Sequence, residues 1–178
     1  MPTRREANVY AVLMSPDSLS EWQTLLSMQA GAAATLTGLV FVAASINLTK
    51  IVATPLLTVR VVESLVQFLQ VFFVRSVMIV PHQSSFALAI EILVVSFMSW
   101  AMQILGFIRY HRARLGNPHW WLGLRLAVTH FSTIPFFVVG IGLLLGLNNA
   151  LYWAVPGFCF SFVAGLFNSW VLLIEVAR

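Results

Sequence analysis

The sequence predicts an all-α membrane protein, a polytopic bundle of five transmembrane helices. Of its 178 residues, 60% are hydrophobic and only 9% are charged, whereas soluble domains carry about 25% charged residues. Three long stretches contain no Lys, Arg, Asp or Glu, namely residues 22–49, 92–108 and 126–174. A helical span needs roughly 20 apolar residues, so the longest stretch is expected to hold two helices with a turn near residues 147–150.

Boundary signals place the first two helices. The first is predicted over residues 19–47, with a capping box at Ser18-Leu-Ser-Glu21. The second is predicted to begin at Thr54-Pro55, an N-cap followed by proline at the first helical position, and to end before Pro81. Residues 1–17 are expected to form a short extracytoplasmic tail.

The remaining helices follow from the apolar runs and from aromatic residues placed as interfacial anchors. They are predicted over residues 85–110, 120–147 and 151–176. Residues 18–178 are therefore expected to form a single five-helix transmembrane domain, because the connections are too short to fold as a separate soluble domain.

Basic residues set the predicted orientation. Those of the first and third connections are Lys50, Arg60, Arg109, Arg112, Arg114 and Arg125. The second and fourth connections carry none. The positive-inside rule then places the N-terminus outside the cell and the C-terminus inside.

Two charges within the spans need an explanation. Arg75 lies six residues before Pro81, and Glu91 lies eight residues after Gln83. Counted at 1.5 Å per residue, both lie roughly 9 to 12 Å below the outer turn. Equal depth on antiparallel helices predicts a buried ion pair, interpreted first as a structural clasp and alternatively as an ion or proton site.

A second polar set lies toward the cytoplasmic side of the second helix. Arg60, Glu63, Gln67 and Gln70 fall on one helical face, within about 80° at 100° per residue. Counted depth adds residues from the fourth and fifth helices, so the candidate polar layer comprises Glu63, Gln67, Gln70, His130 and Asn168. Glu63 and His130 could form a titrating pair. The simpler alternative is a surface ion pair for Glu63 and a satisfied core position for His130.

Small residues at intervals of four indicate close helix packing in lipid. The fifth helix carries Gly157, Ser161, Gly165 and Ser169, and the first carries Ala30, Ala34 and Gly38. For the fifth helix, packing within the bundle is favoured, and contact with another subunit is the alternative.

Arg109, Arg112 and Arg114 are predicted to meet anionic lipid headgroups, with a cytoplasmic partner as the alternative. No nucleophile elbow, phosphate loop or metal-binding motif is present. The sequence therefore predicts no metal, no cofactor, no nucleic-acid partner and no enzymatic activity.

Residues 31–47 (GAAATLTGLVFVAASIN), followed by Arg60, residues 80–83 (VPHQ) and Glu91, resemble a family of small bacterial membrane proteins. Some of its members carry the label "modulator of FtsH protease". The resemblance covers about residues 23 to 100 and implies a multi-pass protein of the bacterial inner membrane.

These features favour two functions ahead of a third, a membrane enzyme that acts on lipid. The first is a non-catalytic accessory or regulatory subunit of a larger membrane assembly, with a membrane-protein partner or a second copy. The alternative is a small oligomeric ion or proton channel or transporter that uses buried polar residues of the second to fourth helices.

Overall fold

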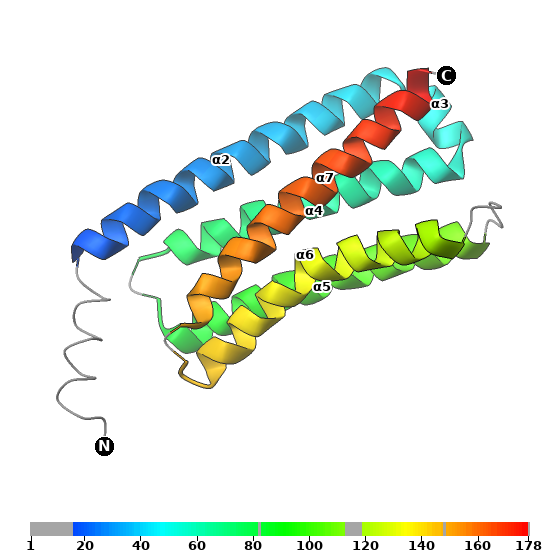
Figure 1. Ribbon diagram of the computed structural model, residues 1–178. Coiled ribbons are helices and arrows are strands. Elements are labelled where there is room, and N and C mark those ends of the chain that lie inside the picture. The colour runs from blue at the N-terminus through cyan, green and yellow to red at the C-terminus, as the bar shows by residue number, and fades with distance from the viewer. Residues whose placement is uncertain (1–15, 82, 113–118, 148, 178) are drawn as a thin grey trace.

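The described part of the protein is an α-helical bundle (Figure 1). The computed structural model describes residues 16–81, 83–112, 119–147 and 149–177. Its elements are α2 (Pro16–Ile46), α3 (Leu48–Ala53), α4 (Pro55–Ile79), α5 (Ser85–Arg112), α6 (His119–Leu144), the 3-10 helix η1 (Ala150–Trp153) and α7 (Ala154–Ala177). Within the described residues, five of the helices are long and apolar enough to cross a membrane. The predicted five-helix fold is therefore confirmed.

The start of α4 was correctly predicted, and the start of α2 was not. Thr54 is the N-cap of α4, and Pro55 occupies the first turn, where its missing N–H costs nothing. The helix α2 begins at Pro16. Ser18 therefore lies inside the helix, and the predicted capping box does not mark the start of α2. The connection before Thr54 also forms the short helix α3, which the sequence interpretation left as a link.

The end of α6 is fixed by Gly146, which the φ angle of 71° places in the left-handed region. The amide of Gly146 donates to the carbonyl of Leu143, and that of Leu147 donates to the carbonyl of Gly142. This pair of hydrogen bonds is a Schellman C-cap, which favours glycine at the left-handed position. The cap ends α6 at Leu144, three residues earlier than predicted.

The helix α4 lies at the centre of the bundle. It packs against α2, α5 and α7, while α6 packs against α5 and α7. Figure 1 shows α2 beginning at the end of the bundle opposite to the one where α7 ends. The connection at Pro81 lies at the end where α2 begins, which is called the Pro81 end below. The helix α3, which contains Lys50, lies at the end where α7 ends, which is called the Lys50 end.

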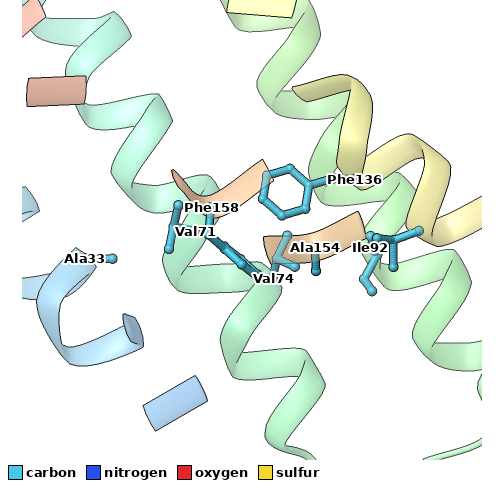
Figure 2. Packing of buried hydrophobic residues seen from close by; sticks show 8 residues of the cluster. Ala33, Val71, Val74, Ile92, Phe136, Ala154 and Phe158 are labelled. Atoms are coloured by element: carbon cyan, nitrogen blue, oxygen red, sulfur yellow. The ribbon is translucent and has the colours of Figure 1, made fainter. Parts of the chain in front are cut away.

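The apolar core lies toward the Pro81 end and joins all five long helices (Figure 2). Its fully buried members are Ala33, Val71, Val74, Ile92, Phe136, Val139, Ala154 and Phe158. The rings of Phe136 and Phe158 meet edge to face, with centroids 5.0 Å apart. Such aromatic pairs contribute about 0.5–1.5 kcal/mol beyond the area they bury.

The small face of α7 packs inside the bundle, as predicted. A Cβ built on Gly165 would lie 2.6 Å from the Phe68 ring of α4, and one on Gly157 would lie 3.0 Å from the Phe136 ring of α6. Both glycines therefore let an aromatic ring approach the backbone of α7. Ser169 is half-buried, and its hydroxyl donates to the carbonyl of Gly165.

The small face of α2 does not pack into the bundle at Ala34 and Gly38. Ala34 and Gly38 are exposed, and a Cβ on Gly38 would meet nothing within 4 Å. The face that meets the bundle instead contains Leu26, Ala33 and Val40. Their spacing of seven is that of a coiled-coil seam, and this seam leaves Ala34 and Gly38 pointing away from α4.

Candidate functional site

Buried polar side chains gather inside the part of the bundle formed by α4 to α7. The central helix α4 supplies Arg60, Glu63, Ser64, Gln67, Gln70 and Arg75. Its neighbours supply Ser96, Ser99, Gln103, Ser132, Thr133, Ser161 and Asn168. None of the described residues of α2 belongs to this set. We refer to these residues together as the polar column.

Hydrogen bonds join four of the helices, α4 to α7, at the middle of the column. Gln67 lies beside the midpoint of the span Leu57–Ile79, and its Nε2 donates to Gln103 Oε1 at 2.8 Å and to Ser132 Oγ at 3.0 Å. Gln103 Nε2 donates in turn to Thr133 Oγ1 at 3.4 Å. Ser161 of α7 donates to the backbone carbonyl of Ser132 at 3.3 Å. Gln67, Gln103, Ser132, Thr133 and Ser161 form what we call the midspan cluster.

Several amide groups beside this cluster have no hydrogen-bond partner in the described protein. They are Gln67 Oε1 and both Nε2 and Oε1 of Gln70. Gln70 is only 1% exposed, so its side chain lies inside the bundle and not on the surface that faces lipid. A buried polar group left unpaired costs about 1–3 kcal/mol, so an internal water or a polar solute is the expected partner.

Toward the Lys50 end, the column continues through charged groups. Arg60 Nη1 donates to Asn168 Oδ1 at 2.8 Å and so joins α4 to α7. Glu63 is also buried, and a Cβ built on Gly106 of α5 would lie 3.4 Å from its Oε1. Asn168 therefore contacts the polar face of α4, where the predicted layer places it. Its partner there is Arg60.

His130 lies at the side of α6 near the same end. It is half-buried, and its Nδ1 lies 2.7 Å from the carbonyl oxygen of Leu126, one turn earlier in the same helix. This contact is typical of a histidine satisfied by its own helix. The pairing of His130 with Glu63 stays a prediction.

The predicted ion pair between Arg75 and Glu91 does not form. Glu91 is exposed and accepts a hydrogen bond from Gln83 Nε2. Arg75 is completely buried, and Phe158 lies against its guanidinium, with Cζ 3.1 Å from the ring centroid. Counting residues fixes the depth of a side chain but not its direction, and Glu91 is turned about 100° around α5 from the buried Ile92.

The basic residues at the end of α5 are exposed where the structure describes them. Arg109 and Arg112 both point away from the packed interior, and Arg114 lies outside the described residues. Their contact with lipid headgroups stays a prediction.

The sequence interpretation missed the contribution of α5 and α6 to the column. Ser96, Ser99 and Gln103 recur at intervals of three and four, which places them on one helical face within an uncharged span. That spacing could have identified Gln103 as a partner for the glutamines of the second helix. Ser132 and Thr133 are adjacent in sequence, and no periodic pattern singles them out.

No protein-family model, curated protein or solved structure matches the chain. Its function is therefore inferred from the geometry of the polar column and of the exposed helix surfaces.

Proposed function

We propose that this multi-pass membrane protein is a non-catalytic channel or transporter of a bacterial inner membrane that passes a small polar solute or ion through the polar column. The proposed path follows α4, from Arg60 near the Lys50 end through the midspan cluster to Arg75 near the Pro81 end.

The unpartnered amides at mid-span are the observation that carries this proposal. Polar groups are expensive in hydrocarbon and usually face a bundle interior or a water-filled path. A purely structural role for Gln67 and Gln70 predicts that their amides pair with protein groups, as interhelical glutamines in membranes do. Gln70 has no such pairing within the described residues. Polar groups that need an internal partner favour a hydrated path.

Flux measurements on reconstituted vesicles test the proposal. Wild-type protein should conduct protons or at least one ion from a panel of small cations and anions. Gln67→Leu and Gln70→Leu should each reduce this flux severely, because they remove polar groups from the middle of the path.

Glu91→Gln and Met102→Leu provide the matched controls. Both positions are exposed on α5, outside the polar column, so both variants should keep wild-type flux. The absence of flux for the whole panel would remove the proposal, as would equal flux from wild-type and Gln70→Leu protein.

The accessory-subunit function remains a second candidate because of the exposed side of α2. Gly31, Ala34 and Gly38 are exposed there, and a Cβ on either glycine would meet open space. Small residues let helices approach closely in lipid, so this surface suits a second copy or a partner protein.

Purification in a mild detergent separates the two candidates. An accessory subunit should be recovered with a stoichiometric partner, and Gly38→Leu should release that partner without lowering the stability of the isolated protein. Recovery of a monodisperse, lone protomer would contradict the accessory role.

A further inference from the structure

We infer that Arg75 binds a small monovalent inorganic anion, such as chloride or nitrate, inside the bundle near its Pro81 end. The side chain is 0% exposed, and Nε, Nη1 and Nη2 all lack a hydrogen-bond partner in the described protein. A guanidinium offers five N–H donors in a planar fork, so a buried arginine in this state presents an unused anion-binding group.

No protein carboxylate fills this role among the described residues. Glu91 is the acidic residue nearest in depth, but it lies on the exposed side of α5 and bonds Gln83. The face of the Phe158 ring attracts the cation, but as an acceptor for the N–H groups it is weak and carries no negative charge. The positive charge of Arg75 therefore has no counter-ion among the described residues, and leaving a buried charge uncompensated costs several kcal/mol.

The surroundings favour a small, weakly hydrated anion. Val71 and Val74 on α4 and Phe158 on α7 belong to the apolar core around Arg75. An anion entering such a site loses its hydration, and this loss costs least for a singly charged, polarisable ion. A lipid phosphate is disfavoured because Arg75 has no surface facing the lipid.

Arg75 also lies only four residues from the end of α4, about 6 Å along the helix axis. The inference that this anion is the transported species rests on the proposed function. The inference that Arg75 binds an anion is tested at equilibrium and does not depend on flux.

Thermal unfolding in a nonionic detergent tests the site. Sodium nitrate, bromide or chloride replaces sodium gluconate at constant ionic strength, so that only the size and hydration of the anion change. Binding to the folded state should raise the melting temperature in a saturable way. Nitrate and bromide should act at lower concentration than sulfate, the reverse of the general salt effect, in which sulfate strengthens burial most.

Arg75→Met removes the charge and keeps an apolar stem, so it should fold but lose the saturable nitrate response. Arg75→Lys keeps the charge without the planar fork and should lower the apparent affinity by about tenfold. If the methionine variant fails to fold, Arg75→Lys tests the anion site instead. Arg109→Gln removes an exposed basic residue and should respond like the wild type.

The inference is overturned if wild-type protein shows no saturable response to small anions, if Arg75→Met keeps that response, or if only added phosphatidylglycerol stabilises the protein. Nitrate binding without flux would support the site and contradict the proposed transport. Proton or cation flux without a thermal response to anions would support the proposed transport and contradict the anion site.

Discussion

At the scale of single residues, Gln67 links the helices at the middle of the bundle. Its amide nitrogen contacts both Gln103 on α5 and Ser132 on α6. Hydrogen bonds between membrane helices average about 0.6 kcal/mol and reach about 1.7 kcal/mol. The midspan cluster therefore adds moderate stability, and its greater effect is to fix which polar groups face the interior.

A double-mutant cycle measures this link. Gln67→Leu and Gln103→Leu should show a coupling free energy of about 0.6–1.7 kcal/mol in unfolding experiments in detergent. Met102→Leu in place of Gln103→Leu is the control and should show no coupling, because Met102 is exposed. Zero coupling between Gln67 and Gln103 would mean that they do not bond.

Arg75 and Glu91 should behave as independent residues. Because Glu91 is exposed, Glu91→Ala should cost at most about 1 kcal/mol of folding free energy. Its effect should add to that of Arg75→Met within about 0.5 kcal/mol. A larger coupling free energy, measured by unfolding in detergent, would show that Arg75 and Glu91 form the ion pair predicted from the sequence.

Arg75 and the polar residues of the second helix show what the sequence can predict at this scale. Arg75 and all four polar residues predicted on the second helix are buried, because an expensive group in a span must face the interior. Their partners were not predictable, since partners depend on how each helix is rotated about its axis. That rotation is set by packing against several helices at once.

At the scale of elements, the packing of α7 depends on two glycines, whereas α2 tolerates larger side chains. The difference follows from their neighbours. Gly165 faces the Phe68 ring, and Gly38 faces open space. Identical small-residue spacing in the sequence therefore has opposite consequences in the two helices.

Gly165→Ala should destabilise the protein by about 1–3 kcal/mol, because the new methyl group overlaps a buried ring. Gly38→Ala is the matched control and should be neutral or stabilising by up to about 1 kcal/mol, since alanine favours helix. Unfolding in detergent measures both. Phe68→Leu should partly rescue Gly165→Ala, and the absence of rescue would show that the clash lies elsewhere.

Helix ends illustrate how far local signals extend. Thr54-Pro55 was read correctly because both residues act within one turn. The C-cap at Gly146 was not predicted, because a glycine in an apolar run permits a left-handed backbone but does not require one. The seam of α2 was missed because it depends on α4, a helix that lies beyond α3 in the sequence.

At the scale of the whole molecule, composition alone determined the fold class. Five long apolar runs favour five helices, since a helix of this length crosses the bilayer and satisfies the backbone groups of each run internally. The central position of α4 was not predictable from composition. Its polar face is what places the column inside the bundle.

The predicted orientation gives a separate test on intact cells. In a Cys159→Ser background, Ser84→Cys should react with a membrane-impermeant thiol reagent, because the Pro81 end is expected outside. Lys50→Cys should react only after the membrane is permeabilised. The opposite pattern would reverse the topology assigned by the positive-inside rule.

Access of water to the middle of α4 is the most direct test of the central claim. In the Cys159→Ser background, Gln70→Cys and Phe73→Cys place thiols one turn apart, the first in the buried polar column and the second on the exposed surface of α4. Reconstituted protein is treated with a small, water-soluble methanethiosulfonate, which reacts only with hydrated thiols. A hydrated path predicts rapid modification at position 70 and none at position 73. An unreactive position 70, with the protein folded, would show that the polar column is dry and would contradict the proposed function.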